Sequence, residues 1–235
     1  MPKIKVIIPA FNEQDSIAKV IQDIPSLVEE IIVVSNNSTD LTEINAKNAG
    51  ATVLTENNKG YGYACLKGMD YIASTSLSDP SKKPDIIVFL DGDYSDYPEE
   101  LTKIIAPIIE DNIDLVIGSR VKELREDGAM TPQQIFGNWL ATNLMSIFFN
   151  AKFTDLGPFR AIKYEKLLAL NMVDKTYGWT VEMQLKALKQ KLSYTEVPVN
   201  YRNRIGVSKV SGTIKGSIFA GIKILSWIFK YSFKQ

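Results

Sequence analysis

Short apolar runs alternate with helix-forming segments over the first half of this chain. We expect strands at residues 3–9, 30–35, 52–55, 86–90 and 113–118. Helices are expected between them, at residues 12–24, 39–49, 62–73 and 97–110. Strands that alternate with helices form βαβ units, whose strands lie parallel in a sheet covered by helices. The sequence therefore predicts an α/β fold with a mostly parallel sheet.

The second half of the chain is less regular. It suggests helices at 135–149 and 180–191, strands at 159–163 and 194–201, and an amphipathic helix from residue 213. We expect a single domain over residues 1–212, with two halves, 1–120 and 121–212, and a tail helix over 213–235.

Composition excludes several classes of chemistry. The chain has 235 residues and no histidine, which rules out Ser-His-Asp and Cys-His catalysis and histidine metal ligands. Its 27 basic and 27 acidic residues balance, so overall charge gives no reason to expect a nucleic-acid partner. Cys65 is the single cysteine, which suits a reducing compartment, and the N-terminus lacks a signal-peptide pattern. We therefore expect a cytoplasmic protein.

Asp91-Gly92-Asp93 directly follows the apolar run 86–90. Two carboxylates one residue apart thus emerge at the carboxyl end of a buried strand, where open α/β sheets bind ligands. A divalent cation that also contacts phosphate oxygens would satisfy both acids. A turn with two solvated acids is the alternative.

Three other polar segments follow or precede predicted elements in the same way, namely residues 9–13, 35–40 and 58–62. Phe11 could lie beside a nucleobase, and the Asn36 amide could pair with a base edge. The glycines around Lys59 would let the backbone approach a ligand, and Lys59 would offset diphosphate charge. Each segment is also compatible with an ordinary turn that caps a helix.

Taken in order, these segments resemble the signatures of family 2 glycosyltransferases. The matching stretches are VIIPAFNE at 6–13, IVVSNNSTD at 32–40, NKGYG at 58–62, FLDGD at 89–93 and IGSR at 117–120. Residues 154–161, 196–202 and 204–209 resemble the dolichyl- or polyprenyl-phosphate sugar transferase branch, as in dolichyl-phosphate mannosyltransferases. The likeness extends to about residue 221.

The resemblance implies a GT-A fold, a nucleotide-sugar donor of the GDP-mannose or UDP-glucose type, Mg²⁺ or Mn²⁺, and inversion at the anomeric carbon. Residues 1–120 would hold the donor and 121–212 the acceptor. The implied donor site comprises Pro9, Ala10, Phe11, Glu13, Asn36, Lys59, Asp91, Gly92 and Asp93. Asp91 and Asp93 would bind the metal and, with Arg120, carry catalysis. Acceptor or phosphate contacts are implied for Arg120, Arg202, Arg204 and Lys209.

One segment departs from the family pattern. Ser35-Asn36-Asn37 stands where the family usually carries Asp-Asp-Gly. The base contact would then come from Asn36, and the identity of the donor's base stays open.

The nature of the acceptor decides whether a general base is needed. A phosphate monoester is largely anionic at neutral pH, because its second pKa is about 6. A polyprenyl phosphate would therefore need no base. A soluble or glycan hydroxyl acceptor would need one, for which Asp155 or Glu182 are candidates. A third hypothesis is a nucleotide-binding protein without catalysis, which rests on the altered Asn36 segment.

The tail helix suggests how a lipid acceptor would be reached. An apolar stripe contains Ile218, Ile222, Leu225 and Phe229, and a second stripe contains Lys215, Lys223, Lys230 and Lys234. This pattern favours a helix that lies in a membrane interface at the cytoplasmic face, and core docking is the alternative. A membrane-protein partner or a homodimer is also compatible with it.

Overall fold

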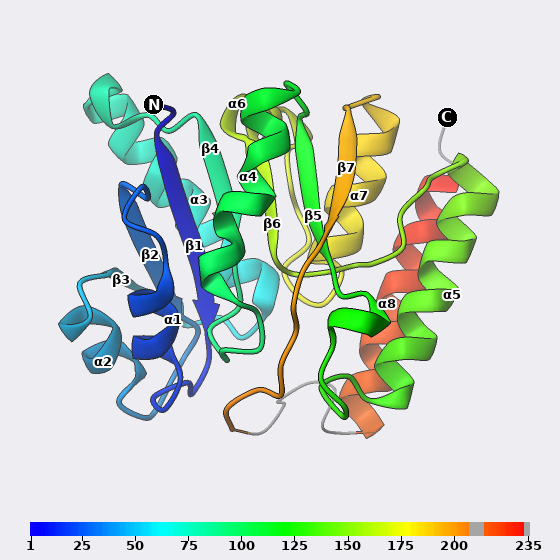
Figure 1. The fold of residues 1–235 in the computed structure, drawn as a ribbon, viewed down its shortest axis with the longest axis horizontal. Helices are drawn as coiled ribbons and strands as arrows, with labels where there is room; N and C mark the ends of the chain where they lie inside the picture. Colours follow the sequence, from blue (N-terminus) through cyan, green and yellow to red (C-terminus); the bar gives the residue numbers. More distant parts are fainter. Residues whose placement is uncertain (207–213, 233–235) are drawn as a thin grey trace.

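A seven-stranded sheet forms the centre of the protein (Figure 1). The structure is a computed structural model that describes residues 1–206 and 214–232, with side chains of the last helix described from residue 219. The strands are β1 (Ile4–Ala10), β2 (Glu30–Ser35), β3 (Thr52–Thr55), β4 (Ile86–Phe89), β5 (Leu115–Ser119), β6 (Arg160–Lys163) and β7 (Tyr194–Pro198). Their order is β3-β2-β1-β4-β6-β5-β7, and β6 runs antiparallel to β4 and β5. The remaining pairs are parallel, which confirms the predicted fold class.

Helices cover both faces of this sheet. They are α1 (Ile17–Asp23), α2 (Thr42–Asn48), α3 (Tyr61–Ser78), α4 (Leu101–Glu110), α5 (Pro132–Phe149), α6 (Tyr164–Leu170), α7 (Trp179–Lys189) and α8 (Ile214–Ser232). Short 3₁₀ turns, η1 (Pro80–Lys82), η2 (Pro98–Glu100) and η3 (Lys122–Leu124), lie in the connections.

Alternating side chains of the central strands point to two separate cores. Val6 and Val88 pack in the layer with α1 and α4, whereas Ile7 and Phe89 pack in the layer with α3 and α7. All four residues are fully buried. Because successive side chains of a strand face opposite sides, a strand buried on both faces must be continuously apolar.

Several predicted boundaries were wrong for local reasons. Helix α1 begins at Ile17 rather than near Asn12, whose positive φ of 54° ends the first strand in a turn. Helix α3 continues to Ser78, and the hydroxyls of Ser74 and Ser76 in its last turns donate to backbone carbonyls one turn earlier. The short helix α6 was not predicted.

The strand order places one crevice at the carboxyl ends of β1 and β4. From β1 the chain moves outward to β2 and β3, then returns to form β4 on the other side of β1. The connections that leave β1 and β4 therefore run in opposite directions and open a gap between them. Ligands of open α/β sheets bind at such a switch point, and the Asp91 segment leaves β4 there.

Helix α8 packs against α5 and α7 rather than standing apart as a tail (Figure 1). Trp227 and Ile228 are buried in the core, and Phe148 of α5 meets Phe229 edge-on at 5.8 Å. Core docking thus accounts for one side of the helix, while Phe219 and Ile222 are exposed. None of the helices within the described ranges has the length and apolarity needed to cross a membrane.

Candidate active site

A cavity of about 510 Å³ lies at the switch point between β1 and β4. We call it the strand-end cavity. The predicted residues that line it are Pro9, Ala10, Phe11, Glu13, Asn36, Lys59, Asp91, Gly92, Asp93, Arg120 and Arg204. The sheet thus brings together segments that are up to about 195 residues apart in sequence, as parallel strand ends require.

The acidic segment presents two different carboxylates to this cavity. Asp93 is buried, and its Oδ1 accepts hydrogen bonds from the backbone N–H of Ser95 at 2.9 Å and from its hydroxyl at 2.6 Å. Its Oδ2 pairs with Arg204. Asp91 is less constrained, because its buried Oδ1 has no hydrogen-bond partner among the described residues. Burial raises the pKa of Asp91, and the positive charge of Arg204 opposes this rise.

These two carboxylates fit a divalent cation. Asp91 Oδ1 is a buried oxygen to which no described residue donates a hydrogen bond, and hard cations such as Mg²⁺ and Mn²⁺ prefer oxygen ligands. Within the described part of the chain, no cluster of three or more acidic or cysteine side chains could hold a metal by itself. Such a site therefore leaves coordination positions for oxygens of a bound phosphate.

Phe11 and Lys59 form one wall of the strand-end cavity. The ammonium of Lys59 lies 5.9 Å from the centre of the Phe11 ring. Behind them, Asn12 joins two loops: its Oδ1 accepts from the Thr39 N–H, and its own N–H donates to Ser38. The aromatic ring and the cation thus face the same space.

Asn36 is committed to the loop beside it. Its Nδ2 donates to the carbonyls of Glu56 at 3.3 Å and Asn58 at 2.6 Å, and its Oδ1 accepts from the Gly60 N–H at 2.8 Å. Both amide hydrogens are used, so the predicted base contact through this amide donor is not available in this arrangement. Asn36 shapes the cavity wall by holding residues 56–60.

The glycines near Lys59 allow a close approach between two parts of the chain itself, and Gly60 also lines the strand-end cavity. A Cβ on Gly60 would lie 2.2 Å from the carbonyl oxygen of Lys175, and one on Gly62 would lie 2.1 Å from that of Asp174. The Tyr63 N–H also donates to the Lys175 carbonyl at 3.1 Å. The sequence did not reveal this close approach between α3 and the loop before α7, while the approach of a ligand to these glycines stays a prediction.

Arg120 stands between the strand-end cavity and a second hollow. The second is a groove of about 720 Å³ along α5, which we call the α5 groove; its rim includes Lys122, Arg125, Trp139 and Lys152. Arg120 lines both spaces. Its guanidinium stacks over the Tyr201 ring, 5.1 Å from the ring centre.

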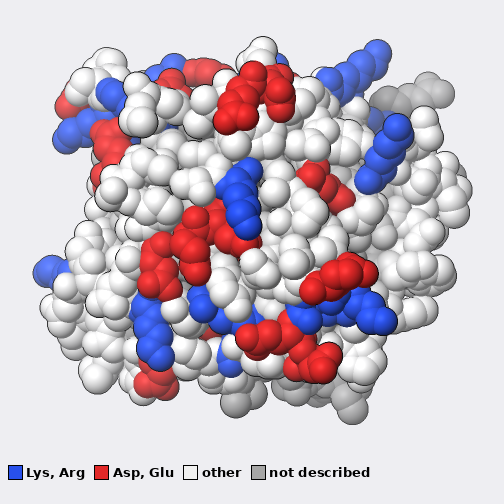
Figure 2. Space-filling view, in the orientation of Figure 1, with Lys and Arg blue, Asp and Glu red and all other residues white. Residues whose placement is uncertain are grey.

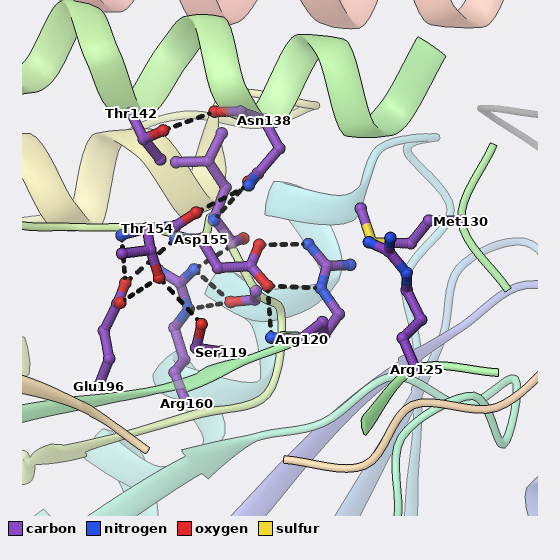
Figure 3. Close-up of polar contacts among 12 residues, drawn as sticks. Ser119, Arg120, Arg125, Met130, Asn138, Thr142, Thr154, Asp155, Arg160 and Glu196 are labelled. Carbon is purple, nitrogen blue, oxygen red and sulfur yellow. Dashed lines mark hydrogen bonds and ion pairs between the residues drawn. The ribbon is translucent and has the colours of Figure 1, made fainter. Parts of the chain in front are cut away.

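Asp155 fixes the position of Arg120 (Figure 3). Arg120 Nε donates to Asp155 Oδ2 at 2.8 Å, Nη2 donates to Oδ1 at 2.6 Å, and the Arg120 backbone N–H also donates to Oδ2. Burial opposes ionisation of Asp155, but the charge and hydrogen bonds of Arg120 prevail and lower its pKa. A carboxylate held in this way is a weak base, and the structure thus argues against Asp155 in that role.

Glu182 is also unsuited to act as a base. Its carboxylate is fully buried, accepts from the backbone N–H groups of Val173 and Asp174, and pairs with Lys186 at 2.7 Å. It does not line the strand-end cavity. Its observed contacts anchor the loop before α7.

The remaining predicted arginines differ from one another. Arg202 does not line the strand-end cavity; it stacks 3.4 Å from the centre of the Tyr94 ring and donates to the carbonyls of Tyr94 and Asp96. Arg204 lies inside the cavity beside Asp93. Lys209 and Lys234 lie outside the described residues, as do the side chains of Lys215 and Ile218.

Sequence reasoning missed several cavity residues. Thr176, Tyr177, Trp179 and Thr180, from the loop before α7 and its first turn, line the strand-end cavity, as does Ala220 of α8. The aromatic residues on either side of Gly178 were the available signal. Their connection to the donor segments depends on the backbone contact at Gly60 and Gly62, which no spacing reveals.

A further buried network supports the segment that carries Asp155 (Figure 3). The Arg160 side chain is completely buried and donates to the carbonyls of Leu156, Gly157 and Thr180. Burial lowers the pKa of Arg160 to about 10. Glu196 accepts from the backbone N–H groups of Thr154 and Asp155. These contacts fix the loop that in turn holds Arg120.

Comparison with known proteins identifies the same family. The model of glycosyl transferase family 2 matches residues 5–168. An uncharacterized glycosyltransferase of Mycobacterium tuberculosis is 31% identical over 220 residues, which cover 92% of this chain and 94% of that protein. The low-salt glycan biosynthesis hexosyltransferase Agl6 of Haloferax volcanii is 29% identical over 213 residues, covering 87% of this chain and 49% of that protein.

Solved structures share the fold. Glucosyl-3-phosphoglycerate synthase of Mycobacterium tuberculosis, in complex with Mn²⁺, uridine diphosphate and phosphoglyceric acid, superposes with a TM-score of 0.76 at 22% identity. The match covers 100% of this chain and 80% of that one. The GT-A architecture of this chain is thereby confirmed.

Proposed function

The chain belongs to glycosyl transferase family 2, and we propose that it moves a hexose from a nucleoside diphosphate sugar to a polyprenyl phosphate at a membrane surface. The observation that carries this proposal is the place of Arg120, which lines both the strand-end cavity and the α5 groove. The donor would occupy the strand-end cavity, and the phosphate of the acceptor would enter from the α5 groove.

The donor side of the reaction follows from the strand-end cavity. Asp91 and Asp93 would hold Mg²⁺ or Mn²⁺, and this cation would offset the charge that develops on the departing nucleoside diphosphate. Phe11 would lie along the base of the donor. Lys59 lines the same cavity beside the Phe11 ring, and its ammonium would contact the diphosphate of that donor. The solved relative that binds Mn²⁺ and uridine diphosphate supports this class of donor.

The acceptor side follows from the charge of the α5 groove. Lys122, Arg125 and Lys152 line it, together with Glu123 and the apolar side chain of Trp139. Arg120 uses Nε and Nη2 for Asp155, and its Nη1 carries two further hydrogens that suit a phosphate oxygen. Such an oxygen is already anionic, so it attacks the sugar carbon without a protein base. Attack from the face opposite the leaving group inverts that carbon.

Helices α5 and α8 would meet the membrane. Their sequences contain no acidic residue, and α5 contains no charged residue at all. Phe136 and Trp139 on α5 and Ile222 on α8 are exposed, and the surface over these helices, at the right of Figure 2, is mostly uncharged. Exposed aromatic and aliphatic side chains beside lysines suit a helix pair lying on an anionic bilayer. This pair would present the α5 groove to the lipid.

A hydroxyl acceptor is the second candidate. It requires a base, and the contacts of Asp155 and Glu182 disfavour both residues that the sequence offered for that role. The phosphate acceptor is therefore preferred. A protein that binds nucleotides without catalysis is less compatible with the Asp91 and Asp93 pair.

A donor and acceptor screen tests the proposal. Purified enzyme with Mn²⁺ is offered UDP-glucose or GDP-mannose, with either a short polyprenyl phosphate or a simple glycan, and sugar transfer is measured. We expect metal-dependent product on the polyprenyl phosphate, and none from Asp93→Ala, while Asp70→Ala on the exposed face of α3 retains activity. Product on the glycan alone would overturn the proposed acceptor, and nucleotide binding without any product would favour the non-catalytic hypothesis.

A further inference from the structure

Arg204 occupies the position on Asp93 that a metal would need. Its Nη2 pairs with Asp93 Oδ2, while Asp93 Oδ1 is held by both donors of Ser95. The Ser95 backbone N–H is fixed by the turn, but the arginine side chain ends on a partly exposed chain of rotatable bonds, with 30% of its surface accessible. Of the two groups on Asp93, the guanidinium is the one that can leave.

The backbone around Arg204 is attached to the acidic segment. The Arg202 N–H donates to the Ser95 carbonyl at 2.9 Å, and the Ile205 N–H donates to the Asp93 carbonyl at 3.0 Å. Residues 202–205 therefore lie as a strap along residues 93–95. This strap keeps the backbone of Arg204 beside the carboxylates. The Arg204 side chain can still rotate, so it can pair either with a carboxylate or with another anion in the cavity.

A metal and the guanidinium cannot share Asp93 Oδ2 without strong repulsion, since both are cations at one buried carboxylate. A diphosphate in the strand-end cavity changes this balance. It supplies a second anion that an arginine binds through two parallel hydrogen bonds. Arg204 lines that cavity, so it needs only a side-chain rotation to exchange Asp93 for a phosphate.

We propose that Arg204 is an internal counter-ion that holds Asp93 until a metal and a nucleoside diphosphate arrive together, and then moves to the diphosphate. This inference rests on the proposed metal site at Asp91 and Asp93. Arg204 blocks binding of the metal alone and favours binding of the metal with the nucleotide. Because such coupling is reciprocal, the nucleotide raises the affinity for metal and the metal raises that for nucleotide.

The neighbouring Arg202 cannot serve as the counter-ion of Asp93 in place of Arg204. Its guanidinium is stacked on Tyr94 and Tyr97, and its donors are used by the carbonyls of Tyr94 and Asp96. These four contacts hold the Arg202 side chain in one conformation, and they attach the strap to residues 94–97. Arg204 has the opposite character, with its ion pair to Asp93 at the cavity surface.

Mn²⁺ binding tests the inference without any measurement of turnover. Free Mn²⁺ is followed by its EPR signal in titrations of metal-free protein, with and without UDP or GDP. If Arg204 holds Asp93 in about 90% of molecules, its removal tightens binding of Mn²⁺ alone by about tenfold. We expect this gain in Arg204→Met, together with weaker binding of UDP or GDP in the presence of Mn²⁺. If the substitution only damaged the structure of the site, it would weaken the binding of Mn²⁺ and the binding of nucleotide alike.

Two further variants separate the possible results. Arg125→Met removes an equal charge from the α5 groove and should leave Mn²⁺ affinity as in the wild type. Arg204→Lys keeps the charge and should lie between wild type and Arg204→Met. Equal Mn²⁺ affinity in wild type, Arg204→Met and Arg125→Met would overturn the inference while the proposed metal site stands. Absence of Mn²⁺ binding in wild type and Arg204→Met, even with nucleotide, would reject the metal site itself and the inference with it.

Discussion

The strand-end cavity and the α5 groove meet at Arg120 but are built in opposite ways. The strand-end cavity is formed where β1, β2 and β4 end, and its acids lie on a segment fixed by fully buried strands. The α5 groove is formed by a helix surface and two loops, and its cations lie at an exposed rim. A sheet edge fixes side chains precisely, whereas a helix surface offers area and apolar contact. The proposed chemistry divides in the same way, with a donor that needs precise geometry and an acceptor that needs a path from a membrane.

Asp91→Asn should have the largest effect, because it acts on the precisely built side. The amide keeps the shape of the carboxylate but removes its charge, so a cation would lose the negative charge of one of its two protein ligands. We expect kcat to fall about 10³-fold, the scale of losing one group that stabilises developing charge. Initial rates with donor and polyprenyl phosphate measure this. Asp70→Asn is the control, and a fall of less than tenfold in Asp91→Asn would mean that this carboxylate does not hold the metal.

A pair of glycine variants tests how rigid the strand-end cavity is. In Gly62→Ala the new Cβ would lie 2.1 Å from the Asp174 carbonyl oxygen, so the loop before α7 must shift. In Gly92→Ala the nearest atom would lie 3.4 Å away, an ordinary contact. We expect Gly62→Ala to lower the free energy of unfolding by about 1–3 kcal/mol, as overpacking does.

Urea unfolding of both variants measures the difference. Gly92→Ala should stay within about 1 kcal/mol of wild type. Equal stability of the two variants would show that the loop before α7 yields easily, and that this wall of the cavity is adaptable.

The sequence predicted the strand-end cavity far better than its surroundings. Short apolar runs that alternate with helical segments favour buried parallel strands. Parallel strands bring their carboxyl ends together, so the amino-acid sequence alone was enough to place Phe11, Asn36 and Asp91 near one another. Their placement needed only the order of the elements.

The partners of these residues could not be predicted in the same way. Arg120, Arg202 and Arg204 have the same chemistry in the sequence, yet one is fixed by Asp155, one is stacked on Tyr94, and one pairs with Asp93. Each partner comes from a tertiary contact. The close backbone contacts of Gly60 and Gly62 were missed for the same reason, because the backbone that they approach lies more than 110 residues further along the chain.

Asp96 offers a pH-dependent test of the boundary between the two regions. Its two carboxylate oxygens are buried and have no hydrogen-bond partner among the described residues. Burial and then the nearby charge of Asp91 raise its pKa from 3.8 to about 8. The folded protein therefore binds a proton that the unfolded chain has released, and stability should fall as pH rises from about 4 to about 8.

Asp96→Asn removes that proton exchange. We expect wild type to lose at most about 1.4 kcal/mol of unfolding free energy per pH unit from this group, and the variant to show a flatter profile. Urea unfolding at pH 5.5 and pH 8 makes the comparison. Parallel profiles for the two proteins would mean that Asp96 is ionised in the folded protein, with its negative charge stabilised by the positive charge of Arg120.

The exposed aromatic residues of α5, Phe136 and Trp139, should give the smallest effect on the fold and a selective effect on membrane binding. Phe136 and Trp139 are 60% and 57% exposed, so replacing both with Ser should change the free energy of unfolding by no more than about 0.5 kcal/mol per site. Their apolar area would enter a bilayer, and its loss should weaken binding to anionic liposomes about tenfold. Sedimentation with phosphatidylglycerol vesicles measures this, with Leu77→Ser on α3, which is 85% exposed, as the matched control. If the wild type proves to be a dimer, and the double variant is a monomer with unchanged liposome binding, α5 joins two copies of the chain. The acceptor must then reach Arg120 by a route other than the lipid surface.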